Sequence, residues 1–223
     1  MALTLFGYRY SVYTRAVRLV LAEKRLRATL VEVDPFAAPL PDGYLDLHPF
    51  GRVPVLEHGP FRLYETAAIC RYLDEALPGP PLQPEDARDR ARMAQVVAIA
   101  DAYVYRPLVR QVYAHAVFRP AEGLASDPAV IAEGLAAAPR ALAALDRIAD
   151  EGRVLTGAAP TLADLHLAPM IAAFTHAPEG AGLIARYPAL DRWWRWMAQR
   201  PSLAATDTGL PVMPPSRSPT ASG

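Results

Sequence analysis

Hydrophobic and polar positions follow one set of periods before residue 78 and another set after it. In the first part, short runs of β-branched and aliphatic residues predict strands, and longer stretches with one apolar face predict helices. Two of these strands flank His58-Gly59-Pro60, a turn sequence that predicts a hairpin. The predicted strands cover residues 3–7, 29–33, 53–57 and 61–64, and the predicted helices cover residues 12–25 and 66–77.

After residue 84 the helical period continues with few interruptions. Proline removes a backbone amide, so each proline inside such a stretch predicts a kink or a break. A serine or threonine followed three residues later by an acid predicts a helix start. On these grounds we predict helices over residues 85–118 (kinked at Pro107), over 127–150 (bent or broken at Pro139), from a capping box at Thr161 and Asp164, and from Pro188 until Pro201 stops it.

A proline-rich segment divides these two patterns. Residues 77–84 hold four prolines and one glycine, so no regular element should cross them. The order before the segment is that of an α/β thioredoxin-like domain, and the pattern after it is all-α. We therefore predict a thioredoxin-like domain at residues 1–77, a linker at 78–84, an all-helical domain at 85–205 and a disordered tail at 206–223.

Composition narrows the functional classes. The 223 residues carry 23 basic and 23 acidic side chains, which argues against a strongly basic nucleic-acid-binding protein. Cys70 is the single cysteine, so no intramolecular disulfide is possible and a reducing, cytoplasmic location is expected. No uninterrupted apolar stretch reaches about 18 residues and no signal-like segment opens the chain, so we expect no membrane partner. Lys24 is the only lysine, which we interpret as a compositional bias towards arginine.

Candidate chemistry begins at the junction of the first strand and the first helix. Ser11 lies where the helix starts, beside backbone amides and the positive end of the helix dipole. Such a position stabilises a bound anion, and a thiolate is one candidate. Tyr10 and Tyr13 are close enough in sequence to be rival hydroxyl donors.

Two further segments have complementary chemistry. The turn Pro49-Phe50-Gly51-Arg52 leads into Val53-Pro54, where a cis bond would expose the backbone of Val53 to an added peptide strand. Glu65 and Thr66 place an acid and a hydroxyl at another helix start, which suits a ligand that carries both an ammonium and a carboxylate. The three segments together predict a site for a small, zwitterionic, thiol-bearing peptide.

These segments, in this order, resemble the glutathione transferases. A fourth segment, Thr161-Leu162-Ala163-Asp164-Leu165-His166 with Pro169, extends the resemblance into the helical part. The match is closest to the phi class of serine-type members. It implies a glutathione-binding thioredoxin-like domain, a helical substrate domain, a homodimer, and conjugation of the glutathione thiolate to small, mostly apolar electrophiles in detoxification.

The resemblance also assigns roles to single residues. Ser11 would hydrogen-bond the glutathione sulfur, because it stands where serine-type members carry their hydroxyl, while Gly7 stands where tyrosine-type members carry their phenol. The cysteinyl part would be contacted by Arg52 and Val53, and the γ-glutamyl end by Glu65 and Thr66. The electrophile pocket would include Tyr10, Tyr103 and Tyr113, although helical spacing equally allows the last two, and Arg106, to face solvent or a partner subunit.

The chain departs from the phi pattern at two points. Pro39 and Leu40 replace the His-Lys pair that holds the glycyl carboxylate, so Arg9 or Arg52 replaces that pair or glutathione binds weakly. Ala67 stands where an arginine is common. Two alternatives therefore remain: reduction of organic hydroperoxides by the same thiolate, and a non-catalytic binding module. The five histidines have no metal-ligand spacing, so glutathione is the only co-substrate expected and no metal is expected.

Overall fold

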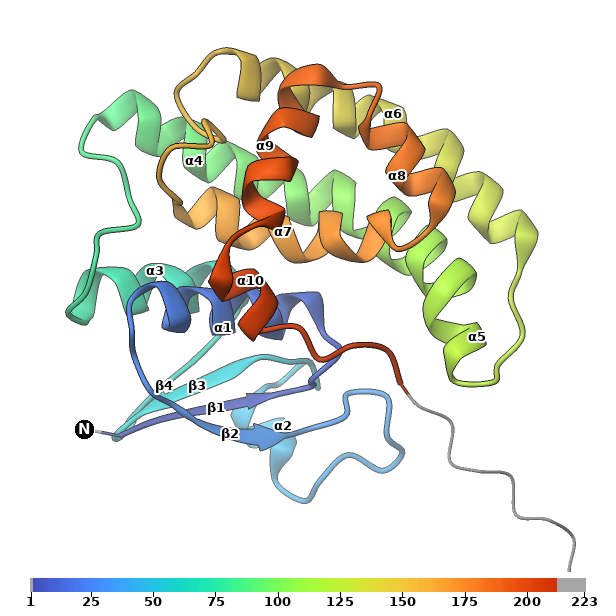
Figure 1. The fold of residues 1–223 in the computed structure, drawn as a ribbon. Helices are drawn as coiled ribbons and strands as arrows, with labels where there is room; N and C mark the ends of the chain where they lie inside the picture. The colour runs from blue at the N-terminus through green and yellow to red at the C-terminus, as the bar shows by residue number, and fades with distance from the viewer. Residues whose placement is uncertain (1, 212–223) are drawn as a thin grey trace, which may run out of the picture.

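The computed structural model describes residues 2–211. Figure 1 shows a β-sheet below helices α1 and α3, with the remaining long helices stacked above them. The sheet has the order β2-β1-β3-β4, in which β1 runs parallel to β2 and antiparallel to β3, and β3 and β4 form the predicted hairpin. The strands are β1 (Leu3–Gly7), β2 (Thr29–Glu32), β3 (Val55–His58) and β4 (Phe61–Tyr64).

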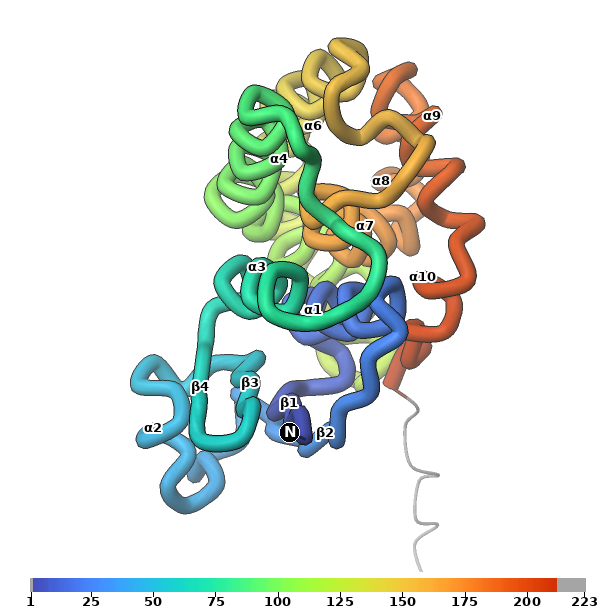
Figure 2. The backbone as a smooth tube through the Cα atoms, turned by 90° about the vertical axis from the view of Figure 1, so that its left-hand side faces the viewer, coloured from blue at the N-terminus to red at the C-terminus, as the bar shows by residue number. Residues whose placement is uncertain are grey.

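Successive side chains along each strand point to opposite faces of the sheet, and different helices cover the two faces. Leu5 and Leu56 point into the large core beneath α1 (Val12–Glu23) and α3 (Thr66–Ala76). Phe6 and Val55 belong to a small cluster on the other face, which the short helix α2 (Tyr44–Leu47) covers. Figure 2 shows α2 apart from α1 and α3. The sequence pattern did not predict α2, because four residues are too few for a helical period to be visible.

The second part is helical, as predicted, and differs from the prediction in detail. The predicted 85–118 helix is continuous but changes from α winding in α4 to π winding in η1, which contains Pro107. The second predicted helix passes through Pro139 unbroken. Pro201, expected only as a stop, also opens a short helix of its own. The elements are α4 (Ala87–Ile99), η1 (Ala100–Phe118), α5 (Arg119–Ala121), α6 (Pro128–Asp150), α7 (Leu162–Thr175), α8 (Pro178–Ile184), α9 (Pro188–Ala198) and α10 (Pro201–Ala205).

Helix α7 lies at the centre of the molecule. Every residue from Leu162 to Phe174 is buried. The predicted capping box is present: Asp164 accepts from the Thr161 amide at 2.7 Å and from the Trp193 indole at 2.7 Å. A buried carboxylate is costly unless it is hydrogen-bonded, so these contacts are needed for α7 to begin inside the core.

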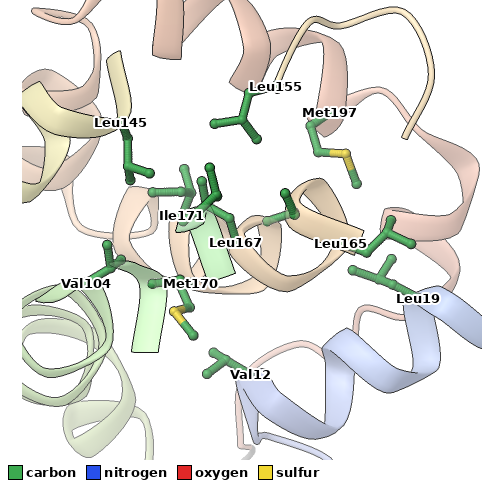
Figure 3. Close-up of a cluster of buried hydrophobic side chains, with 14 of the residues drawn as sticks. Val12, Leu19, Val104, Leu145, Leu155, Leu165, Leu167, Met170, Ile171 and Met197 are labelled. Atoms are coloured by element: carbon green, nitrogen blue, oxygen red, sulfur yellow. The ribbon is translucent and has the colours of Figure 1, made fainter. Parts of the chain in front are cut away.

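One hydrophobic core joins the two parts of the chain. Figure 3 shows Val12 and Leu19 of α1 facing side chains of α7 such as Leu165 and Met170, and all four belong to one buried cluster. Separating α1 from α7 would expose this apolar surface to water, at roughly 25 cal/mol for each Å². The sheet part and the helical part therefore hold each other in a fixed arrangement, and any cavity at their junction is preformed.

Helix α6 is long and apolar enough, by length and composition, to cross a membrane. The sequence pattern did not single it out, because charged residues interrupt its apolar run. In this structure α6 packs along η1 and against α8 and α9. It is therefore an apolar helix of the bundle.

The last described residues contradict the predicted tail. Residues 206–211 are among the described residues, Thr206 is buried, and residues 206–208 contact the first part of the chain. Arg15 of α1 lies 3.3 Å from Asp207 and donates to the Leu203 carbonyl at 2.9 Å, while the Thr208 hydroxyl donates to the Arg9 carbonyl. The prediction of disorder was wrong for this stretch because its polar residues find partners far away in sequence. Residues 212–223 lie outside the described residues.

Lys24 ties the linker to both helices above the sheet. Its ammonium is almost fully buried and donates to the Asp74 carboxylate at 3.0 Å and to the carbonyls of Asp74 and Pro80. Asp74 in turn accepts from the Leu82 amide at 2.9 Å and from Gln83 at 3.1 Å. All three ammonium donors are therefore used, and the only lysine of the chain has a structural role that composition alone did not reveal.

We predict that Lys24→Met lowers the free energy of unfolding by about 3–5 kcal/mol, because it leaves the Asp74 carboxylate buried without its cation. Urea denaturation followed by circular dichroism measures this loss. Arg27→Met is the matched control: Arg27 is exposed, three residues away, and its replacement should change stability by less than about 0.5 kcal/mol. A loss below about 1 kcal/mol for Lys24→Met would show that the buried pair does not hold the linker.

Candidate functional site

A cavity of about 700 Å³ lies at the junction of the two parts of the chain. One wall comes from the thioredoxin-like part, through residues 8, 10–13, 35–36, 48, 50–54 and 65–67. The opposite wall is one face of η1, from Asp101 to Phe118. A ligand that enters this cavity contacts both parts at once. The cavity brings together the predicted residues Ser11, Arg52, Val53, Glu65 and Thr66, together with Tyr10 and Tyr113.

Ser11 is the N-cap of α1, as predicted. Its hydroxyl oxygen accepts from the Thr14 amide at 3.3 Å, and its backbone is extended with φ −75° and ψ 123°. Because a hydroxyl that accepts through oxygen keeps its hydrogen, Ser11 still has one donor to offer at the helix start. Gly7, at the end of the adjacent strand, packs closely against Thr14: a Cβ at Gly7 would overlap the Thr14 side chain, which would have to shift.

Tyr13 differs from Ser11 in its surroundings. Burial, with the negative charge of Asp101 adding to it, raises the pKa of the Tyr13 phenol. The ring also packs against Tyr105 at 4.8 Å between centroids. Of the two hydroxyls, that of Ser11 lies at the helix start, and that of Tyr13 is on a ring packed between Tyr105 and the charge of Asp101.

Asp101 is itself held by a buried histidine. His166 of α7 lies 2.7 Å from Asp101 through Nε2, and its side chain is 2% exposed against 42% for that of Asp101. Nδ1 of His166 is buried and has no hydrogen-bond partner among the described residues. His166 therefore orients Asp101 from behind while the carboxylate borders the cavity. The sequence analysis named His166 only as part of a motif and did not name Asp101. Their contact could not be predicted because the two residues lie on different helices, 65 positions apart in the sequence.

Arg52 and Val53 lie in the turn before β3. The predicted cis bond between Val53 and Pro54 is present, and a second one joins Ala38 to Pro39. Tyr44 of α2 fixes this turn by donating its buried hydroxyl to the Arg52 carbonyl at 2.7 Å. The Arg52 side chain is exposed at the cavity, and the ladder between β1 and β3 ends at Val55, so Val53 lies beyond the paired part of the strand.

Glu65 and Thr66 form the start of α3. Glu65 has a positive φ of 72°, an unfavourable conformation for a residue with a side chain, and its side chain makes no capping hydrogen bond. Thr66 is buried at the first position of the helix, where backbone amides lack helical partners. Glu65 is therefore not an ordinary side-chain cap, and its carboxylate remains exposed at the cavity.

The basic residues near the cavity are few. Arg9 lies outside it and pairs with Glu32 at 3.2 Å, so it does not replace the missing basic pair. His48 lines the cavity, but burial lowers its pKa, so it is neutral near pH 7. Pro39 and Leu40 do not line it. Of the two arginines predicted to replace the basic pair, only Arg52 lines the cavity. Arg110 of η1, which the sequence analysis did not name, also lines it.

The prediction that Tyr103 belongs to the electrophile pocket was wrong. Tyr103 is 65% exposed and lies off the cavity, and Arg106 is also exposed and pairs with Glu133. Tyr113, one of the other predicted tyrosines on η1, does line the cavity. The reason is helical phase: Asp101, Tyr105, Val109 and Tyr113 recur every four residues on the cavity face. That four-residue spacing was visible in the sequence and would have separated Tyr113 from Tyr103.

Cys70 and Trp193 both belong to the buried core. Cys70 is 3% exposed on the core face of α3, and burial raises the pKa of its thiol, so it offers no reactive thiolate. Trp193 is 1% exposed in the core of the helical part. Among residues 2–211, no group of three or more histidine, cysteine, aspartate or glutamate side chains is arranged to hold a metal ion.

Comparison with known proteins places these features in a family. Models of the glutathione S-transferase N-terminal and C-terminal domains match residues 5–81 and 128–204. Glutathione S-transferase F13 of Arabidopsis thaliana is 30% identical over 218 residues, which cover 96% of this chain and 99% of that protein. Glutathione S-transferase 3 of Zea mays is 31% identical over 220 residues, with 97% and 98% coverage. The solved structure of glutathione S-transferase III in apo form superposes with a TM-score of 0.81 at 30% identity, covering 96% of this chain and all of that one.

The comparisons confirm the resemblance and the fold class that the sequence predicted. Both domain models match in the predicted order, and the relatives extend over almost the whole chain. The chain belongs to the glutathione S-transferase family of enzymes, and its relatives include plant members of the phi class.

Proposed function

We propose that this enzyme conjugates the thiolate of glutathione to small electrophiles, with Ser11 as the donor to sulfur. One observation supports this most strongly. The Ser11 hydroxyl accepts from the Thr14 amide and keeps its own hydrogen, at the cavity end of α1. A sulfur placed there meets a hydroxyl donor and the positive end of a helix dipole together.

The energies needed are modest. A free cysteine thiol has a pKa of about 8.5, so roughly 3% of it is thiolate at pH 7. A decrease of about two units costs about 2.7 kcal/mol and raises the thiolate fraction to roughly three quarters. A hydrogen bond to a charged group contributes about 1.5–3 kcal/mol and a helix terminus about 0.3–1 kcal/mol. Donation by Ser11 is therefore sufficient, and no protein base has to hold the proton.

The rest of the tripeptide has matching groups along the same wall. Glu65 offers a carboxylate to the γ-glutamyl ammonium, and the start of α3 at Thr66 offers backbone amides to its carboxylate. Val53, beyond the paired part of β3, is available to the cysteinyl backbone. Arg52 lines the cavity without an ion pair among residues 2–211, which suits the glycyl carboxylate.

The electrophile would occupy the helical side of the cavity. In this proposal residues 85–205 form the substrate domain, and Tyr10 and Tyr113 are two of the pocket residues. Burial raises the pKa of Tyr113 to about 12, so its phenol stays protonated and can donate to an oxygen of the electrophile. The neighbouring aromatic rings supply the apolar part of the pocket.

Three further expectations belong to the same proposal. We propose a homodimer, since Phe50 and Tyr103 are 68% and 65% exposed and burying such rings against a second subunit would be favourable. We propose a reducing, cytoplasmic location, which the single buried Cys70 supports. Detoxification is the role that conjugation of small electrophiles would serve.

We predict that Ser11→Ala lowers kcat/KM for glutathione and 1-chloro-2,4-dinitrobenzene at pH 6.5 by about tenfold or more, because the sulfur loses its donor. Ser11→Gly separates donation from helix capping, since glycine is tolerated at an N-cap at a cost of a few tenths of a kcal/mol. Both variants should lose turnover alike while Ser11→Gly keeps the thermal stability of the parent.

Tyr10→Phe and Tyr13→Phe are the matched controls, because each removes a rival hydroxyl and keeps the ring. Both should retain turnover within about threefold. Turnover that survives Ser11→Ala and disappears in one of these variants would transfer the donor role to that tyrosine. Cumene hydroperoxide, assayed beside the aryl chloride, tests whether the same thiolate also reduces organic hydroperoxides.

We predict that Arg52→Met raises the KM for glutathione about tenfold and changes kcat by less than about twofold, because it removes binding that substrate and transition state share. The effect should vanish with a glutathione derivative whose glycyl carboxylate is an amide. Arg62→Met, at an exposed arginine on β4 that pairs with Glu57, is the control. Equal losses for glutathione and its glycyl amide would show that Arg52 does not bind that carboxylate.

A further inference from the structure

The electrophile side of the cavity is lined by a connected series of aromatic rings. Tyr10 meets Tyr8 at 5.4 Å between centroids, and Tyr8 meets Phe36 at 6.2 Å, both with their planes nearly perpendicular. On the helical side Tyr10 meets Phe118 at 5.3 Å, and Phe118 meets Tyr113 at 6.0 Å. We call these five side chains the aromatic wall; it begins next to Ser11, since Tyr10 precedes it in the chain.

Arg110 ends this wall. Its guanidinium carbon lies 5.3 Å from the ring centroid of Phe36, so η1 reaches across the cavity to the loop after β2. Arg110 is exposed at the cavity and forms no ion pair among residues 2–211. Arg106, one helical turn earlier, pairs with Glu133 and does not line the cavity.

The acids of the cavity do not neutralise Arg110. Asp101 is paired with His166 at 2.7 Å. Glu65 lies at the start of α3, on the wall assigned to the tripeptide. The electrophile side therefore combines a guanidinium, which matches a carboxylate in shape and charge, with flat rings that stack on another aromatic ring.

We propose that the electrophile of this enzyme is a planar aromatic compound that carries a carboxylate, with the ring against the aromatic wall and the carboxylate on Arg110. The inference rests on the proposed function and names the substrate class of that site. With an aryl halide of this class, the glutathione sulfur forms the new carbon–sulfur bond, the carbon–halogen bond breaks and the halide leaves with its electron pair, and the thiol proton passes to solvent.

The first test measures binding, so that it does not depend on turnover. 3,5-Dinitrobenzoate and its methyl ester share one ring and differ in charge, and neither has a leaving group. Isothermal titration of the whole protein, with glutathione present, should give an affinity about tenfold higher for the carboxylate than for the ester. Arg110→Met, which keeps an unbranched apolar side chain, should remove that preference, and Arg110→Lys should keep part of it because lysine retains charge without the planar fork. Arg106→Met is the matched control and should leave both affinities unchanged.

The second test follows turnover of 4-chloro-3,5-dinitrobenzoate and its methyl ester. We expect Arg110→Met to lower kcat/KM about tenfold for the carboxylate and less than twofold for the ester. Equal binding of carboxylate and ester by the parent protein, or an unchanged preference in Arg110→Met, would overturn the inference. The inference would also be overturned if Arg110→Met raised the KM for glutathione and did not raise the KM for the glycyl amide of glutathione. Arg110 would then bind the tripeptide and not the electrophile.

The two tests separate this inference from the proposed function. If the parent protein turns over neither chloride, conjugation of such acceptors fails, whereas the titration still decides whether Arg110 selects a carboxylate. If it turns over both chlorides at equal rates and Arg110→Met changes neither, the transferase function stands and the substrate class is wrong.

Discussion

The chemistry of the site depends on the way in which the start of helix α1 is held. β1 ends at Gly7 against the side chain of Thr14, and Arg15 is bound by Asp207 and the Leu203 carbonyl. The apolar face of α1 packs against α7. The helix is fixed on these sides, and the Ser11 hydroxyl lies at its N-terminus beside the cavity. The hydroxyl oxygen accepts from the Thr14 amide, and its hydrogen remains available to a ligand. A donor that is already in place when the ligand binds loses no free energy to reorganisation. Such a preorganised donor stabilises a charged sulfur more strongly than one that must first move.

The same rigidity explains why the site lies where it does. Because one core extends from the sheet helices into the helical bundle, the two parts form a single body with a permanent cavity at their junction. The tripeptide wall is built from helix starts and a strand entry, where backbone groups are free to pair with a ligand. The opposite wall is one face of η1, where side chains alone decide what binds. In the proposed function the first wall binds the constant co-substrate, and side chains of η1 such as Arg110 select among electrophiles.

Local signals in the sequence carried much of this picture. The two periodicities predicted the strands and the long helices, and helix-start chemistry was enough to draw attention to Ser11 and to Glu65 with Thr66. The features that were missed depend on contacts between distant residues. Asp101 acquires its partner from α7, the carboxylate and carbonyl around Lys24 come from α3 and the linker, and residues 206–208 contact Arg9 and Arg15 near the start of the chain. Tyr103 was misplaced although helical phase would have corrected it, because family resemblance indicated the helix and not its face.

The central claim is that a hydroxyl at position 11 holds the bound sulfur as an anion, and it can be measured directly. The thiolate of glutathione absorbs in the ultraviolet where the thiol does not, so a pH titration of the complex reports the pKa of the bound thiol. The account predicts a midpoint about two units below the value of roughly 8.5 for a free thiol, and a return to near that value in Ser11→Ala with glutathione still bound. A midpoint that is the same in the parent protein and in Ser11→Ala would contradict the account.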